Sequence, residues 1–201
     1  MTDPIAVAVF CASSERVNPF YPRLAGQVGA ELAARGWTLV SGGGSVGMMG
    51  ALARAARAAG ARTVGVIPRA LAELEVADHD ADELVVTSDM RERKGLMDAR
   101  ADAFLTLPGG IGTLEELLEI WVSRSLGMHA KPVVVLDPLG DFAPLRAQIE
   151  RLVTAGFVRS SAAGEVRWAQ TVAEAFGALE AGLASPHGRD APADEFLEAD
   201  L

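Results

Sequence analysis

The chain has 201 residues, of which half are hydrophobic, and its 27 acidic and 18 basic side chains give a formal net charge of −9. This length is enough for one α/β domain with a sizeable core. The acidic balance excludes sequence-independent nucleic-acid binding, which needs a basic surface. The single cysteine, Cys11, excludes an intrachain disulfide and is typical of a reducing cytosol. No apolar run reaches the ~20 residues that span a bilayer, so we expect a cytoplasmic protein with no membrane partner.

Short apolar runs alternate with segments of helical periodicity along most of the chain. Strands are expected at 5–12, 37–40, 62–68, 83–87, 103–107, 131–137 and 165–169. Helices are expected at 21–36, 48–60, 88–101, 114–126, 141–156 and 171–183, and the acidic stretch 69–83 is expected to be a loop with partial helix. This alternation predicts an α/β fold, a single Rossmann-like doubly wound parallel sheet with helices on both faces. We assign it to residues 1–184 and expect the acidic tail, 185–201, to be disordered.

Ligands of such sheets bind beyond the carboxyl ends of the strands, in loops that lead into helices. Four stretches occupy that position. They are CASSE at 11–15, SGGGSVGMMG at 41–50, TSDMRERK at 87–94 and PGGIGTLEE at 108–116.

The first glycine turn matches the dinucleotide pattern G-x-G-x-x-G at Gly42, Gly44 and Gly47. The pattern follows the second strand rather than the first, and Arg69 stands where an acidic ribose ligand is expected. Two interpretations stay open. One is nucleotide contact, including NADP with an arginine on its 2′-phosphate, and the other is a tight turn with close helix–strand packing.

The second glycine turn, at 108–113, opens a helix whose first amides would form an anion site. Thr113 and Glu116 match a capping box, in which the glutamate bonds back to the helix N-terminus. The stripe expected to face the sheet consists of Leu114, Leu117, Leu118 and Trp121. Glu116 lies opposite that stripe, and these patterns alone favour capping over catalysis.

The helix expected at 88–101 carries cations beside an apolar stripe. Met90 and Met97 share the stripe, the cations Arg93, Lys94 and Arg100 flank it, and Arg91 points away. The side chains could simply cover apolar surface while their charged ends reach water. Alternatively they form a cationic wall facing the crevice. With Glu116 nearby, this wall could cleave a bond to a ribose phosphate, since the glycines hold the phosphate and the glutamate addresses the sugar carbon.

Other reactive side chains predict less. The three histidines, His79, His129 and His187, lack metal-ligand spacing, so we expect no metal. Cys11 is expected to be a small buried side chain. Ser13 and Ser14 have no evident His/Asp pair, which argues against a nucleophilic triad.

The stretches SGGGSVGMMG, GVIPRALAELE, MRERKGLM and PGGIGTLEE, in this order, resemble the LONELY GUY family over about residues 5–182. The resemblance implies cofactor-free hydrolysis of the N-glycosidic bond of N6-substituted AMP, a nucleoside monophosphate, to free base and ribose 5-phosphate. It implies Arg93 and Glu116 as catalytic residues. It implies substrate contacts at Gly43, Gly44, Glu75, Lys94, Gly109, Gly110, Ile111, Gly112, Thr113, Leu114 and Glu115.

Two other functions remain alternatives. Similar folds also carry nucleotide-like cofactors without cleaving them, and an NADP enzyme is disfavoured by the position of the first glycine turn. The decarboxylase activity often attributed to this family needs a Schiff-base lysine, and neither lysine, Lys94 or Lys131, has a suitable context.

Apolar residues on more than one face of the helix at 88–101, and on the far side and past the end of the helix at 114–126, predict a two-fold homodimer. They are Met90, Leu96, Met97, Ile120, Leu126 and Met128. The resemblance also implies a two-chain assembly with the cleft near its interface.

Overall fold

The computed structural model describes residues 4–73 and 76–185. Seven strands form one sheet: β1 (Ala6–Phe10), β2 (Thr38–Ser41), β3 (Thr63–Pro68), β4 (Glu83–Thr87), β5 (Ala103–Thr106), β6 (Val133–Leu136) and β7 (Val166–Ala169). Their order across the sheet is β4-β3-β2-β1-β5-β6-β7, and every neighbouring pair is parallel. The strand order reverses between β1 and β5, so the prediction of a doubly wound parallel sheet is confirmed.

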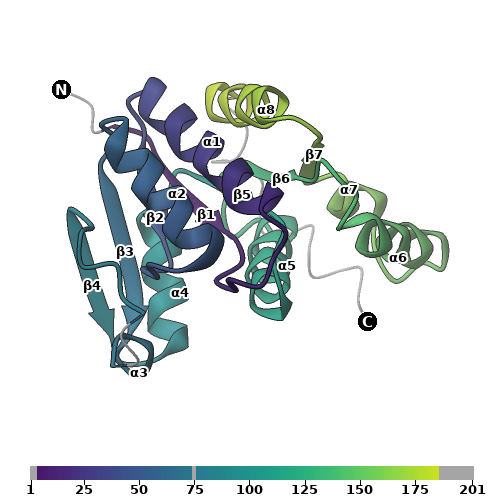
Figure 1. Ribbon diagram of the computed structural model, residues 1–201. Helices are drawn as coiled ribbons and strands as arrows, with labels where there is room; N and C mark the ends of the chain where they lie inside the picture. Colours follow the sequence, from purple (N-terminus) through teal and green to yellow (C-terminus); the bar gives the residue numbers. More distant parts are fainter. Residues whose placement is uncertain (1–3, 74–75, 186–201) are drawn as a thin grey trace.

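Helices cover both faces of this sheet (Figure 1). They are α1 (Phe20–Ala34), α2 (Gly47–Ala58), α3 (Arg69–Ala72), α4 (Met90–Ala99), α5 (Ile111–Ser125), α6 (Ala143–Thr154), α7 (Ser160–Ala163) and α8 (Val172–Ala184). One face packs against α1, α2 and α8, and the other packs against α4 and α5, with α6 at its edge. None of the helices in the described ranges has the length and apolar character needed to cross a membrane.

The core consists of two apolar layers separated by the sheet. Val7 and Val9 of β1 point into the layer under α1 and α2, whereas Ala8 and Phe10 point into the layer under α4 and α5. Because both faces are buried, the strands are continuous apolar runs rather than alternating ones. This is why the strands were recognisable from the sequence.

Local signals explain most element boundaries. The side chain of Asp89 accepts hydrogen bonds from the backbone amides of Arg91 and Glu92, so it caps α4. The partial helix expected within 69–83 is α3. The sequence reading missed α7, a single turn of four residues that is too short to show helical periodicity.

Candidate active site

A cavity of about 530 Å³ lies at the carboxyl ends of β1, β2, β3 and β5, across the point where the strand order reverses. All four stretches expected from the strand-end rule contribute to it. Its lining residues are Cys11, Ala12, Ser13, Ser14, Gly42, Gly44, Val46, Met49, Ile67, Leu71, Val76, Met90, Arg93, Gly110, Gly112, Thr113, Glu115 and Glu116. This lining combines apolar side chains, among them Leu71, Val76 and Met90, with residues at the start of α5.

Arg93 and Glu116 form a buried ion pair in the wall of this cavity, with only 5% and 7% of each residue exposed. Nη1 of Arg93 donates a hydrogen bond of 2.7 Å to Oε1 of Glu116, and its Nε donates to the Val66 carbonyl at 3.1 Å. Burial raises the pKa of the Glu116 carboxyl, although Arg93 opposes that rise. The pair therefore presents a poorly solvated carboxyl group and a fixed cation to whatever occupies the cavity.

The capping-box prediction for Glu116 is wrong. Helix α5 begins at Ile111 with Gly110 as N-cap and no side-chain cap, so Thr113 and Glu116 both lie inside the helix. The predicted sheet-facing stripe is also partly wrong, because Leu118 is 37% exposed while Glu116 and Ile120 are buried. The physical reason is that α5 faces α4 through ion pairs as well as packing on the sheet, and the Arg93 partner makes burial of Glu116 tolerable.

The N-terminus of α5 is open to the cavity. A Cβ atom added at Gly110 or Gly112 would meet no protein atom within 4 Å, so packing does not require glycine there. The first amides of a helix have no intrahelical acceptors and favour an anion. Gly109 differs, because its added Cβ would lie 2.1 Å from Oγ1 of Thr113, so this glycine is needed for the turn itself.

The first glycine turn is filled by protein atoms instead. A Cβ at Gly42 would lie 2.0 Å from Nη2 of Arg93. Gly47 has a φ of +58°, and its Cβ would lie 2.6 Å from the Ser13 backbone. The Met49 amide donates to the Ala12 carbonyl at 3.2 Å. These contacts support the packing interpretation, in which the turn seats Arg93 and the loop after β1.

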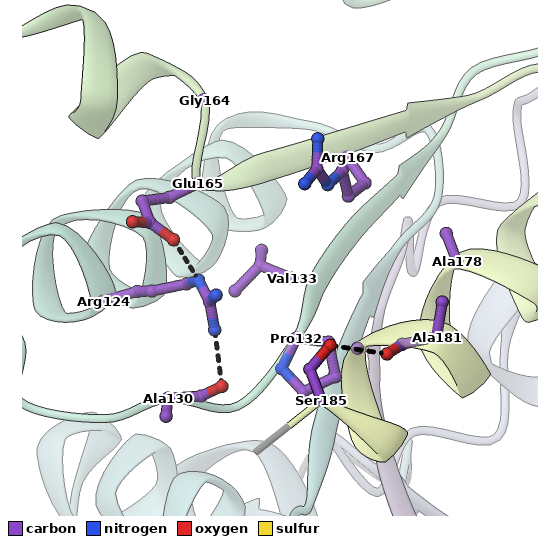
Figure 2. Close-up of a pocket in the computed structure, with 11 residues that line it drawn as sticks. Arg124, Ala130, Pro132, Val133, Gly164, Glu165, Arg167, Ala178, Ala181 and Ser185 are labelled. Carbon is purple, nitrogen blue, oxygen red and sulfur yellow. Dashed lines mark hydrogen bonds and ion pairs between the residues drawn. The ribbon is translucent and has the colours of Figure 1, made fainter. Parts of the chain in front are cut away.

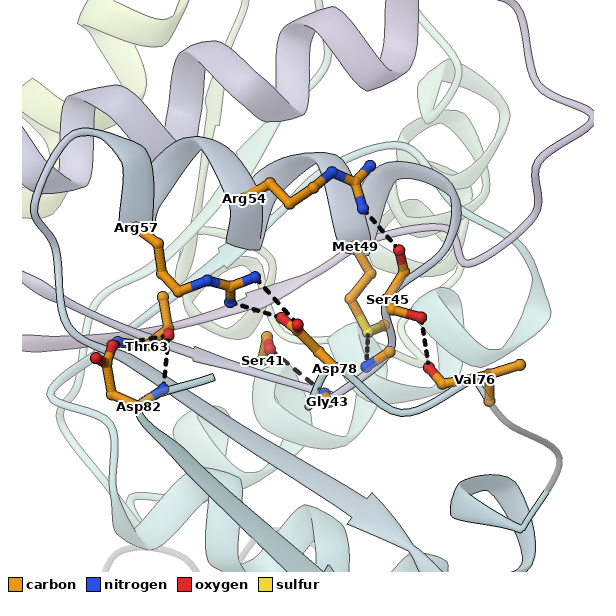
Figure 3. Close-up of polar contacts among 11 residues, drawn as sticks. Ser41, Gly43, Ser45, Met49, Arg54, Arg57, Thr63, Val76, Asp78 and Asp82 are labelled. Atoms are coloured by element: carbon orange, nitrogen blue, oxygen red, sulfur yellow. Dashed lines mark hydrogen bonds and ion pairs between the residues drawn. The ribbon is translucent and has the colours of Figure 1, made fainter. Parts of the chain in front are cut away.

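Residues 76–78 lie as a strap across the first glycine turn, as Figure 3 shows. The Ser45 amide donates to the Val76 carbonyl, and the Asp78 amide donates to the Gly43 carbonyl, both at 2.8 Å. Arg57 of α2 holds the strap through two bonds to the Asp78 carboxylate, at 2.7 and 3.0 Å. The sequence reading missed this strap, since its partners are distant in sequence and show no local pattern.

The α4 cations separate into different environments. Arg91 is exposed, as expected from the helical wheel. Arg100 bonds to Glu83, the first residue of β4, so it lies near the amino end of the sheet and the prediction that it faces the crevice is wrong. Lys94 pairs with Glu115 and, at 2.7 Å, with Glu119, both on α5.

Only some of the substrate-contacting residues implied by the resemblance line the cavity. Gly44, Gly110, Gly112, Thr113 and Glu115 line the cavity, whereas Gly43, Lys94, Gly109, Ile111 and Leu114 are not among its lining residues. Glu75 lies outside the described residues.

Cys11 is buried as predicted. Burial raises the pKa of its thiol far above the ordinary range, and the Glu116 charge adds to this rise, so the thiol is a poor nucleophile. Within the described ranges, no three His, Cys, Asp or Glu side chains gather as metal ligands would.

A second cavity of about 480 Å³ lies near the amino ends of β6 and β7, beside α8 (Figure 2). Its most buried cation, Arg124, is already used internally. Nε of Arg124 bonds to Glu165 at 2.6 Å, and Nη1 bonds to the carbonyls of Ala130 and Lys131. Arg124 therefore secures the end of α5, and the crevice at the strand reversal is the better candidate site.

A doubly wound sheet with a crevice at its strand reversal defines a Rossmann-type α/β protein. The family model described as possible lysine decarboxylase matches residues 49–179. A cytokinin riboside 5′-monophosphate phosphoribohydrolase of Mycobacterium marinum is 58% identical over 78% of this chain and 83% of its own length. Its namesake in Mycobacterium tuberculosis is 53% identical over 81% and 86%, and one from Arabidopsis thaliana is 43% identical over 76% and 70%. The chain belongs to this family, the LONELY GUY family.

Solved structures support the fold. The molybdenum cofactor carrier protein of Chlamydomonas reinhardtii superposes with a TM-score of 0.70 at 24% identity, covering 91% of this chain and all of that one. The molybdenum cofactor binding protein of Rippkaea orientalis gives 0.66 at 22% identity, covering 90% and 98%. At these identities the likeness concerns the fold alone.

The decarboxylase description of the family model has no counterpart in the crevice. The chain has two lysines. Lys94 is paired with two glutamates of α5, and Nζ of Lys131 bonds to the carboxylate and carbonyl of Asp98. Neither lines the cavity in which a Schiff base would have to form.

Proposed function

We propose that the protein hydrolyses the N-glycosidic bond of N6-substituted adenosine 5′-monophosphates, releasing free base and ribose 5-phosphate. The observation that carries this proposal is the buried Arg93–Glu116 pair beside an uncapped helix N-terminus, in one cavity. The names and high identities of the relatives support the same substrate class. A cavity of about 530 Å³ lies within the size range of small-molecule sites.

Each part of the cavity has a separate task in this proposal. The phosphate binds the amides at the start of α5, where Gly110 and Gly112 leave room. Glu116 stabilises positive charge that develops at the ribose C1′ and orients the attacking water. Arg93 holds Glu116 in position and, with its remaining donors, faces the substrate anion.

The apolar lining of the cavity is proposed to receive the N6 substituent. Leu71, Val76 and Met90 provide this surface, and the strap at 76–78 keeps Val76 in place. Apolar contact of this kind distinguishes substrates by about 1–3 kcal/mol per methylene. The protein should therefore prefer isopentenyladenosine monophosphate to AMP while still accepting AMP.

The direct test is incubation with isopentenyladenosine monophosphate and with AMP, followed by chromatography for free base and ribose 5-phosphate. Release of both products in equal amounts is the expected result. Tight binding without release of base would contradict the hydrolase and favour the alternative, a nucleotide or cofactor carrier.

We also propose that the protein is a homodimer in the cytoplasm. Ile120 and Met97 cannot form the interface predicted from the sequence, because both are buried in the monomer. The large apolar residues that remain exposed on α4, on α5 and just after α5 are Met90, Ile111, Leu118, Val122, Leu126 and Met128. Such a patch is typical of a self-complementary interface.

Light scattering coupled to gel filtration tests the dimer. The expected particle has twice the chain mass at micromolar concentration, and Val122→Glu should reduce it to one chain. A monomeric unmodified protein would contradict this part of the proposal.

A further inference from the structure

A small cavity of about 70 Å³ lies between α4 and α5, behind the candidate site. Gly95 and Asp98 of α4 line one side, Glu119 and Ser123 of α5 line the other, and Glu116 forms part of its wall. In the part of the chain that the structure describes, Glu116 is the one residue that lines both this cavity and the large crevice. Glu116 therefore lies between two cavities.

The small cavity runs from the surface toward the back of Glu116. Gly95 and Glu119 are exposed, whereas Phe10 and Ile120, which also line it, are buried. Its volume is sufficient for ordered water, and its walls provide carboxylates, a hydroxyl and the Lys94 ammonium as hydrogen-bond partners. Both conditions for a hydrated cavity are thus met.

We propose that this cavity is a rear water channel that solvates the Glu116 carboxylate and connects it to solvent while substrate fills the crevice. The proposal rests on the hydrolase function proposed above. A bound nucleotide would cover the front of Glu116, so a residue that takes up a proton there needs another way to release it. The rear channel supplies that route without opening the active site.

With this route, every proton in the reaction is accounted for. The bond between ribose C1′ and the base nitrogen breaks, and the water oxygen bonds to C1′. One water proton passes to Glu116 and leaves through the channel, and the base takes up one proton from water as it leaves the crevice. The reaction needs no other reactant.

Charged and titratable groups from three elements lie near Glu116, and Asp98 of α4 lines the same small cavity. Helix α4 contributes Arg93 and Lys94, α5 contributes Glu115 and Glu119, and Cys11 faces it from the loop after β1. Burial already raises the pKa of Glu116. Removing water from the channel would disfavour the ionised carboxylate further, so the pKa of Glu116 should rise again.

Two substitutions fill the channel without touching the crevice. In Gly95→Leu, the new side chain starts in open space, since an added Cβ meets no atom within 4 Å. Ser123→Leu fills the opposite wall. The matched control is Gly177→Leu in α8, another exposed helical glycine whose added Cβ meets no atom, but far from the site.

The first readout does not need activity. Infrared titration of the carboxyl band that disappears in Glu116→Gln gives the pKa of Glu116 in each folded variant. We expect a rise of about one pH unit in Gly95→Leu or Ser123→Leu and none in Gly177→Leu. In the hydrolase assay, the acid limb of kcat should move up by the same amount, with KM changed less than twofold.

An unchanged Glu116 pKa in folded filling variants would overturn the proposal. A high-resolution crystal structure of the unmodified protein with an empty, dry cavity would overturn it also, even if both variants failed to fold. The pKa and the crystal structure report on the channel alone, whereas failure of the unmodified protein to release base would count against the proposed hydrolase function.

Discussion

The two glycine turns look alike in sequence but differ in what occupies the space beside them. At the first turn, a Cβ on Gly42 would collide with the Arg93 guanidinium, and one on Gly47 would collide with the Ser13 backbone. At the second turn, a Cβ on Gly110 or Gly112 would meet no protein atom. Gly42 and Gly47 of the first turn are therefore positions of close packing, whereas Gly110 and Gly112 of the second turn leave open space at the N-terminus of α5.

The two turns therefore have different roles in the candidate site. The first turn packs against the Arg93 guanidinium, and the second leaves the N-terminus of α5 uncapped and uncovered, as the proposed phosphate site requires. Glu116 lies in α5, the helix that follows the second turn. It also forms an ion pair with Arg93, whose guanidinium packs against Gly42 of the first turn. Substitutions at the Arg93–Glu116 pair, at the first turn and at the second turn should therefore affect different quantities: turnover, stability or phosphate binding.

Glu116→Gln should produce the largest effect. It preserves the shape of the side chain but removes the negative charge opposite the developing cation, so kcat should fall by at least about 10²-fold. Steady-state kinetics with isopentenyladenosine monophosphate measure the loss, with the melting temperature as a control for folding. Normal turnover of a folded Gln variant would contradict the catalytic role.

Arg93→Ala should be nearly as damaging and should also destabilise the fold. It leaves the Glu116 carboxylate buried without its partner, a change that costs about 3–5 kcal/mol in comparable pairs. Denaturant unfolding and kinetics would show both losses. Arg91→Ala is the matched control, because Arg91 is exposed on the same helix and should have little effect; equal losses in the two variants would contradict the assignment.

Gly42→Ala should lower kcat by about tenfold or more, with little change in KM. The new methyl group displaces the Arg93 guanidinium from Glu116, and small displacements in a catalytic site have effects of this size or larger. A crystal structure of the variant with Arg93 unmoved would show that the turn does not position it.

Gly112→Ala should have the smallest effect and a different character. The methyl group enters open space, so the melting temperature should stay within a degree or two. The inhibition constant for ribose 5-phosphate, a competitive inhibitor, should rise several-fold, since the methyl group obstructs the helix end. Unchanged inhibition would remove this turn from the phosphate site.

The sequence predicted the sheet and the position of the crevice, because continuous apolar runs and strand-end loops are local patterns. The side of α4 on which Arg93 lies was also predicted correctly, since helical periodicity depends on near neighbours. Glu116 was placed on the wrong side of α5, because its burial depends on a partner from another helix. The Arg57–Asp78 bond, which holds the strap, is likewise a tertiary contact with no sequence pattern.

The buried position of Arg93 and Glu116 has a consequence for selection. Well-packed apolar pairs are often as stable as buried ion pairs, or more so. A screen of random variants for thermal stability alone would therefore enrich paired apolar replacements at these two positions. The selected variants would have lost hydrolase activity. Engineering a more thermostable variant of this protein therefore needs a selection for both catalytic turnover and thermal stability.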